Sequence, residues 1–141
     1  MSYKQTYKSV WHGKEVKVIG KKVMNKSAFE IGLIVEGQGK LLAPKKTGRL
    51  AASITTQARL MGTQPKGEGA VASDLIGSPQ ADMMIYVGTP VEYGPYIEFG
   101  TNRTESQAFL RPALALAKGK TLTVVLDNGR AQFKEYLRPR I

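Results

Sequence analysis

The spacing of apolar residues near the N-terminus predicts a long helix from about residue 14 to residue 42. Apolar side chains recur there at helical intervals, at Val16, Ile19, Val23, Met24, Ala28, Ile31, Val35 and Leu42. Four glycines interrupt the stretch, and each weakens a helix by about 1 kcal/mol relative to alanine. Packing against the rest of the protein must therefore stabilise this helix. Pro44 ends the helix. Another interpretation makes residues 16–19 a strand after a hairpin turn at His12 and starts the helix near Lys21.

Two later segments alternate with the two-residue period of strands. Residues 53–60 place Ile54, Thr56, Ala58 and Leu60 on one face and predict a half-buried strand. Residues 83–87 predict a second strand that ends at Gly88. Residues 61–82, between them, are rich in glycine and proline and predict a long flexible loop. The simplest pairing of the two strands is antiparallel.

The C-terminal third predicts one short and one long helix. Residues 91–99 place Tyr93, Tyr96 and Phe99 along one helix edge, which we interpret as core packing, and Gly100 ends this helix. Pro112 suits the first position of the long helix, which continues to about Leu137. The β-branched residues 121–125 and a glycine at position 129 weaken its continuity.

These elements predict an α+β fold in one domain spanning residues 1–141. Its small antiparallel β-sheet packs with two long helices and one short helix, and a long loop joins the strands. Residues 1–12 alternate loosely and predict an N-terminal arm or strand. A chain of 141 residues is long enough for a single hydrophobic core.

The net charge of +10 arises from 21 basic and 11 acidic residues, with much of the excess in the first fifty positions. Such a field attracts nucleic acid and acidic protein surfaces alike, and it also keeps a protein in solution. The absence of cysteine excludes disulfides and thiolate metal sites, and it fits a reducing cytoplasm. No apolar run approaches the roughly eighteen residues of a membrane span, so no membrane is expected as a partner.

No motif predicts catalysis. Residues 46–48 read KTG, a box of penicillin-recognising enzymes, but the partner motifs of that class are missing. Glu92 and Glu98 have no histidine or second acid nearby in the sequence, so we expect salt bridges with Arg49, Arg103 or Arg111 instead. The only histidine, His12, is expected to cap or pack a helix entrance. We therefore expect no enzyme, no catalytic residue, no metal and no cofactor.

Three segments in order resemble a known family. Residues 43–54 read APKKTGRLAASI, residues 87–101 read VGTPVEYGPYIEFGT, and residues 107–114 read QAFLRPAL. Together they are similar to the signature of the putative tail-component, or neck, family of long-tailed bacteriophages. Two departures are Gly94, where the family commonly has alanine, and Gln107-Ala108, where a proline often precedes the phenylalanine.

The resemblance implies a structural virion protein of the phage neck at the head–tail junction, assembled in the cytoplasm of a bacterial host. Such a subunit forms a homo-oligomeric ring, a hexamer in preference to a dodecamer, that joins the head connector to the tail around the DNA channel. Its partners would be the head-completion or connector protein, the tail-terminator or tail tube protein, and the duplex DNA passing through. The alternatives are a tail-terminator protein capping the tail tube and, from another class, a DNA-binding module.

The resembling segments, together with Arg103 between two of them, contain the candidate functional residues. Contacts with channel DNA or between subunits are assigned to basic residues, namely Lys45, Lys46, Arg49, Arg103 and Arg111. Structural roles are assigned to the remaining motif positions, namely Thr47, Gly48, Gly88, Tyr93, Glu98, Phe99, Gly100 and Pro112. Thr47 and Gly48 fit a turn with unusual backbone angles, Gly88 and Gly100 end elements, and Pro112 begins one. For Arg49, Glu98 and Arg111, roles in orienting these junctions or in bridging subunits are favoured over direct DNA contact.

Overall fold

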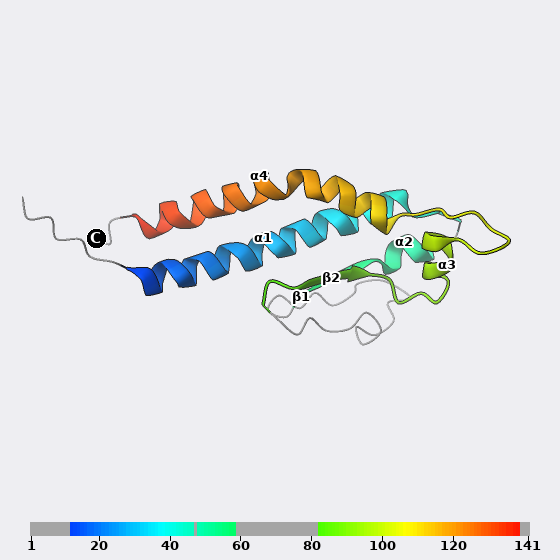
Figure 1. The fold of residues 1–141 in the computed structure, drawn as a ribbon, viewed down its shortest axis with the longest axis horizontal. Helices are drawn as coiled ribbons and strands as arrows, with labels where there is room; N and C mark the ends of the chain where they lie inside the picture. The colour runs from blue at the N-terminus through cyan, green and yellow to red at the C-terminus, as the bar shows by residue number, and fades with distance from the viewer. Residues whose placement is uncertain (1–11, 47, 59–81, 139–141) are drawn as a thin grey trace, which may run out of the picture.

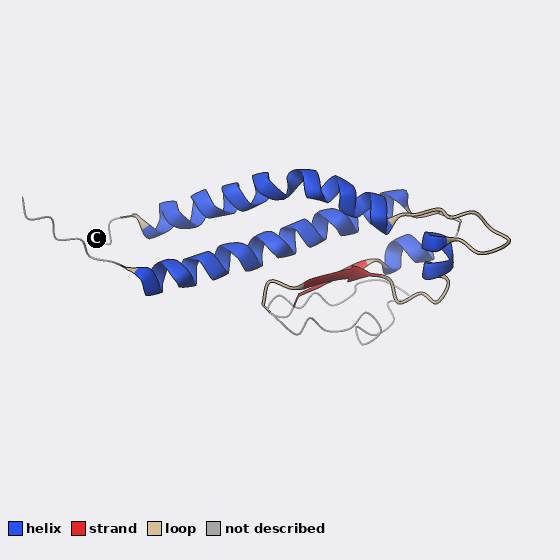
Figure 2. Ribbon diagram, viewed as in Figure 1, coloured by secondary structure: helices blue, strands red, loops and turns tan. Residues whose placement is uncertain are grey.

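Two long antiparallel helices, α1 (Gly13–Leu42) and α4 (Leu110–Tyr136), run side by side along the length of the molecule (Figure 1). A two-stranded sheet lies against the C-terminal half of α1, and two short helices lie near its end (Figure 2). The computed structural model describes residues 12–46, 48–58 and 82–138. The α+β prediction is confirmed, whereas the predicted N-terminal arm and most of the predicted loop at residues 61–82 lie outside the described residues.

Helix α1 is continuous from Gly13, so the alternative that placed a strand at residues 16–19 is wrong. His12 occupies the N-cap position, as expected for a residue at a helix entrance, although its side chain makes no capping hydrogen bond. Along the helix, Lys40 pairs with Glu36 at 2.5 Å, one turn apart. Ala43 has extended backbone angles before Pro44, which is the conformation that a following proline favours and which ends the helix.

Small apolar residues let α4 approach α1 closely. Ala113 and Ala117 are fully buried and share a cluster with Val35 of α1. Toward the other end of the pair, the buried Asn128 amide donates hydrogen bonds to Ser27 Oγ at 3.2 Å and Glu30 Oε2 at 2.6 Å. Neither residues 121–125 nor the glycine at position 129 interrupts α4. Packing along α1 therefore outweighs the weak helix propensity of those positions.

Strands β1 (Thr55–Ala58) and β2 (Ile85–Gly88) pair antiparallel, as predicted, with Thr55 opposite Gly88 and Ala58 opposite Ile85. Both strands are shorter at their beginnings than the alternation predicted. The prediction that β1 is half-buried is wrong, because its first three residues are all buried. Helix α1 covers the face that carries Thr56, whose hydroxyl donates to the Gly32 carbonyl at 3.1 Å.

That contact depends on the absence of a side chain at Gly32. A Cβ atom there would lie 2.7 Å from both Thr56 Cγ2 and Ile85 Cγ2, well inside normal contact distance. The helix backbone thus rests directly on both strands. The glycine that weakens the helix locally sets the distance between the helix and the sheet.

A short helix that the pattern did not predict, α2 (Arg49–Ser53), supplies part of a second core. Leu50 and Ile54 are buried there with Ala43, Val91 and Phe109. Gly48 precedes α2 with a left-handed φ of 71°, as expected for its turn, and Thr47 lies outside the described residues. This core joins the end of α1 to the beginning of α4. No helix among residues 12–46, 48–58 and 82–138 is long and apolar enough to cross a membrane.

Candidate functional site

The buried carboxylate of Glu98 caps the N-terminus of α4. It belongs to the short helix α3 (Gly94–Phe99), which follows β2. Glu98 Oε2 accepts hydrogen bonds from the backbone N–H groups of Phe109 at 2.8 Å and Leu110 at 2.9 Å. Glu98 Oε1 accepts from the N–H of Arg111 at 3.0 Å and from the Arg111 guanidinium Nε at 3.0 Å. A side chain of α3 therefore caps the N-terminus of α4.

This arrangement explains the proline of the motif. The first four N–H groups of an α-helix have no partner within it. At α4 the first three belong to Phe109, Leu110 and Arg111, and all donate to Glu98, while the fourth position is Pro112, which has no N–H. The prediction that Pro112 takes the first helical position is wrong, because α4 begins at Leu110. The Glu98 cap starts the helix two residues earlier.

The environment of Glu98 favours its charged form. Burial by itself would raise the pKa of this carboxyl group. The hydrogen bonds from the N–H groups of Leu110, Phe109 and Arg111, together with that from the Arg111 side chain, outweigh it and hold the pKa below its ordinary value of 4.5. The positive end of the α4 dipole acts in the same direction. Glu98 is therefore an anionic structural group and is poorly suited to act as a general base at neutral pH.

Arg111 is held by the same junction. Its Nη2 donates to the Glu98 carbonyl oxygen at 2.7 Å, and its guanidinium lies 5.1 Å from the centre of the Phe99 ring. The predicted pairing of Glu98 with Arg111 is confirmed. The predicted salt bridge of Glu92 is wrong, since Glu92 forms no ion pair within the described part of the chain. Arg49 likewise has no acidic partner there, so the ion pair that would orient the junction is not formed, and its role between subunits stays a prediction.

Gly100 turns the chain between α3 and α4, and it ends α3 as predicted. Its φ is 77°, and a Cβ atom would lie 2.8 Å from the backbone nitrogen of Ser106 and 3.0 Å from the Thr104 carbonyl oxygen. The loop is closed by a backbone bridge between Thr101 and Thr104 and by the Ser106 hydroxyl, which donates to the Glu98 carbonyl at 2.7 Å. Only glycine fits this position.

The aromatic edge of α3 faces solvent. Tyr96 is 62% exposed and Phe99 is 68% exposed, and Tyr93 is also exposed, so the prediction of core packing is wrong. Helix α3 instead buries Gly94 and Glu98 on its other side. A Cβ atom on Gly94 would lie 2.8 Å from Thr89 Cγ2, so Thr89 occupies the space that an alanine at this position would need.

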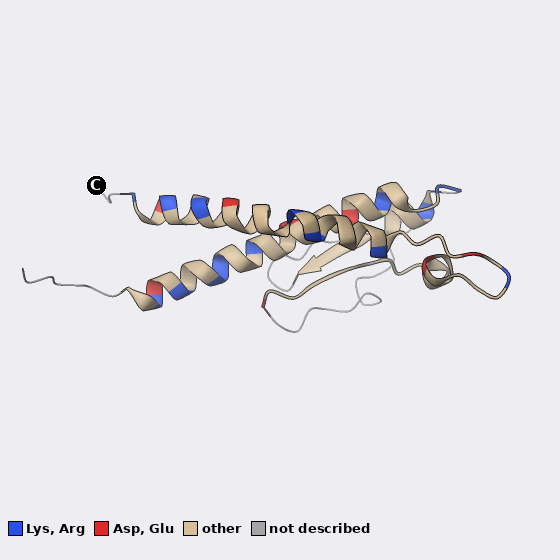
Figure 3. Cartoon of the chain, turned by 45° about the horizontal axis from the view of Figure 1, so that its top comes forward, with Lys and Arg blue, Asp and Glu red and all other residues tan. Residues whose placement is uncertain are grey.

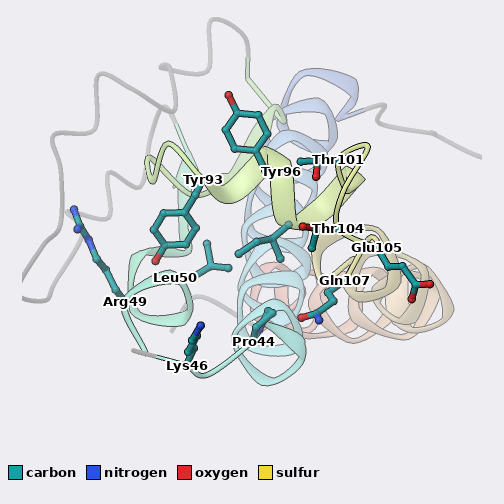
Figure 4. Close-up of a pocket in the computed structure, with 11 residues that line it drawn as sticks. Pro44, Lys46, Arg49, Leu50, Tyr93, Tyr96, Thr101, Thr104, Glu105 and Gln107 are labelled. Atoms are coloured by element: carbon teal, nitrogen blue, oxygen red, sulfur yellow. The ribbon is translucent and has the colours of Figure 1, made fainter.

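A groove of about 670 Å³ lies beside this aromatic edge (Figure 4). Pro44, Leu50 and Ile97 contribute apolar surface, and Tyr93 and Tyr96 stand at its side. Lys46 and Arg49 approach it from the segment around α2, and Glu105 and Gln107 from the loop before α4. In the view of Figure 4, Arg49 and Glu105 lie at opposite sides. The volume falls within the range of small-molecule sites.

The candidate residues separate into three groups. Lys46, Arg49 and Tyr93 come together at the groove. Gly88 ends β2 as predicted, and Arg111, Glu98, Phe99 and Gly100 belong to the α3–α4 junction. Lys45 and Arg103 are exposed but do not line the groove. Sequence reasoning missed Tyr96 as a surface residue, because periodicity does not say which helix face is inward.

The described residues contain no group of three or more histidine, aspartate or glutamate side chains that could hold a metal ion. Comparison with protein families, with characterised proteins and with solved structures finds no match. The geometry itself consists of a capped helix junction and an open groove with cations on one side. This arrangement is suited to binding and to holding elements in place.

Proposed function

We propose that this protein is a structural subunit of the neck of a long-tailed bacteriophage, forming a ring that joins the head connector to the tail. The observation that carries the proposal is the convergence of the resembling segments at one end of the molecule. Residues 87–101 supply Glu98 and Gly100, residues 107–114 supply the helix start that Glu98 caps, and residues 43–54 pack beneath them through Leu50 and Ile54. The motif residues thus serve to build and stabilise the fold, which is what a structural protein requires.

Exposed apolar side chains on the long helices support an oligomer. Leu41 is 65% exposed on α1, and Leu122 is 69% exposed on α4, one turn from the exposed Leu126. Leu114 and Leu116, nearer the start of α4, are exposed as well. Neighbouring subunits in a ring would remove such residues from water, which is the main favourable term in protein association.

Positive charge on the helices suits a ring that surrounds DNA. Lys14, Lys17 and Lys21 are exposed and recur at steps of three and four, which places them along one stripe of α1. Figure 3 shows lysine and arginine along both α1 and α4. Phosphate groups of a passing duplex would be attracted to such a surface without any reading of sequence.

Electron microscopy of a lysate from the parent phage with this gene disrupted tests the proposal. Separate heads and finished tails that never join are the expected result. Joined virions of normal appearance would contradict it. Heads carrying tails of irregular length would instead assign the protein to the tail terminator, the alternative position in the same assembly.

The purified chain provides an independent test. Native mass spectrometry and negative-stain microscopy should detect closed rings, either alone or with the connector protein. The competing DNA-binding hypothesis, favoured by the lysine stripe, expects the isolated chain to bind a short duplex tightly, with affinity falling steeply as salt rises. A ring subunit should bind free duplex weakly, because only an assembled channel surrounds the DNA with positive charge.

A further inference from the structure

We infer that the groove between α2, α3 and the loop before α4 binds an acidic segment of another protein that carries apolar side chains. The inference rests on the groove alone and would hold even if the neck proposal failed. Four features of the site, namely its charge, its apolar surface, its exposed tyrosines and its rigid frame, favour this class of ligand.

Within the described part of the chain, the cations of the groove have no acidic partner. Lys46 and Arg49 are exposed, and neither forms an ion pair with any carboxylate in the described part of the chain. Two lysines of α1, by contrast, pair within the helix, Lys26 with Glu30 and Lys40 with Glu36. The chain as a whole carries +10, so an acidic partner would be attracted over a long range as well as at contact.

The surface beside the cations is apolar and aromatic. Leu50, Ile97 and Pro44 line the groove, and Tyr93 and Tyr96 present rings to solvent beside it. Tyrosine and arginine are enriched at the energetic centres of protein interfaces, because each combines a large contact area with a polar end. The tyrosines therefore suit apolar side chains of a bound segment, while Lys46 and Arg49 suit its carboxylates.

Features of the groove also disfavour nucleic acid as its occupant. Glu105 stands on the side opposite Arg49 and would repel a phosphate backbone that crossed the groove (Figure 4). The remaining lining on that side, Thr101, Thr104 and Gln107, is uncharged. A polypeptide can place a carboxylate at one side and a neutral or basic group at the other, whereas a duplex carries phosphate along its whole length.

The frame of the groove is rigid where the ligand would lie. Ile97 belongs to α3, whose Glu98 is fixed by the α4 cap, and the Ile97 carbonyl accepts a hydrogen bond from the Gln107 N–H at 2.9 Å. Leu50 is anchored in the buried core with Ile54 and Phe109. A preformed surface lowers the entropy lost on binding, so a short segment can bind with useful affinity.

Fluorescence anisotropy with labelled hexapeptides tests the inference on the full chain. A peptide of alternating glutamate and leucine should bind, whereas peptides of alternating lysine and leucine or of glutamate and serine should bind at least about tenfold more weakly. Arg49→Glu and Tyr96→Ser should each weaken binding of the glutamate–leucine peptide by roughly tenfold. Equal binding of all three peptides, or of the wild type and both variants, would overturn the inference.

Two control variants match these substitutions in chemistry. Lys22→Glu reverses an exposed charge on α1, and Leu137→Ser removes an exposed apolar side chain at the C-terminal end of α4, both away from the groove. Each should leave peptide affinity within about twofold of the wild type, because rim charges far from a site act only through the screened overall field. All four sites are exposed, so circular dichroism should report an unchanged fold. Loss of binding in the controls would show that net charge or general apolar surface binds the peptide, and would overturn the assignment to the groove.

Two further outcomes identify other occupants and also overturn the inference. Displacement of the peptide by a short duplex, with Arg49→Glu but not Lys22→Glu abolishing duplex binding, would assign the groove to nucleic acid. Self-association that is lost in Arg49→Glu and Tyr96→Ser, with no peptide binding by the wild type, would assign it to a second copy of the chain. Peptide binding by a protein that forms no rings and is dispensable for joining would retain the groove and refute the neck proposal.

Discussion

Glu98 and Arg111 hold each other through both their side chains and the backbone. The Arg111 guanidinium donates Nε to the Glu98 carboxylate at 3.0 Å and Nη2 to the Glu98 carbonyl at 2.7 Å, while the Arg111 backbone N–H donates to the same carboxylate. The two residues lie 13 positions apart, at the end of α3 and the beginning of α4. This pair fixes the short helix on the long one and thereby sets one wall of the groove.

Replacing Glu98 with glutamine should destabilise the protein by about 2–4 kcal/mol. Glutamine has an NH2 group in place of one carboxylate oxygen, and this donor would face backbone N–H groups that are donors themselves. Buried N–H groups of α4 would then have no hydrogen-bond acceptor. Urea denaturation followed by circular dichroism measures the change. Glu92→Gln is the matched control, since Glu92 is exposed without an ion pair in the described residues, and its effect should stay within about 0.5 kcal/mol. Equal effects of the two substitutions would contradict the capping role.

The stability of the fold should also fall in acid because of Glu98. Its pKa in the folded protein is below the ordinary 4.5, so the unfolded chain binds the proton more readily. The stabilisation is fully present above about pH 4.5 and is lost as pH falls through the lower folded pKa. Denaturation midpoints measured from pH 7 downward should therefore drop more steeply in the wild type than in Glu98→Gln. Parallel pH profiles would show that other carboxyl groups account for the acid sensitivity.

A single methyl group at Gly32 should separate the helix from the sheet. Gly32→Ala places a Cβ atom 2.7 Å from side chains of both strands, and overpacking of this kind costs about 1–3 kcal/mol. Gly37, five residues later on α1, has nothing within 4 Å of its Cβ position. Gly37→Ala should therefore stabilise the protein by about 0.5–1 kcal/mol through helix propensity. Thermal unfolding of the two variants should shift in opposite directions, and shifts of the same sign would contradict the close approach.

The sequence predicted the long helices well because their signals are periodic over many residues. Residues 14–42 and 112–137 were expected as helices, and the structure has Gly13–Leu42 and Leu110–Tyr136. The antiparallel pairing of the strands and the pairing of Glu98 with Arg111 were also predicted. These features follow from element order and from charges in a short connection. The five-residue helix α2 was missed because it is too short to show a period.

The orientation of α3 could not be read from hydropathy. Its buried face carries Gly94 and Glu98, and its exposed edge carries Tyr93, Tyr96 and Phe99, so the usual relation between apolarity and burial is reversed. Glu98 is buried because α4 offers it a set of unpaired N–H groups, a partner that lies more than ten positions away. A local capping motif is visible in a sequence, whereas a cap supplied by another element becomes visible only in the fold.

Asn128 should be irreplaceable by aspartate despite the similar size of the two side chains. Its amide nitrogen donates to Glu30 Oε2 at 2.6 Å and to Ser27 Oγ at 3.2 Å, and these bonds join α4 to α1. Asn128→Asp removes the donor and places a second carboxylate beside Glu30, at a cost of about 2 kcal/mol near neutral pH. The cost should shrink as the pH is lowered and the two adjacent carboxylates come to share a proton, which restores a hydrogen bond. Asp127→Asn, at the exposed neighbouring position, should change the free energy of unfolding by less than about 0.5 kcal/mol. A pH-independent loss in Asn128→Asp would show that shape, and not the donated hydrogen bonds, holds the two helices together at this point.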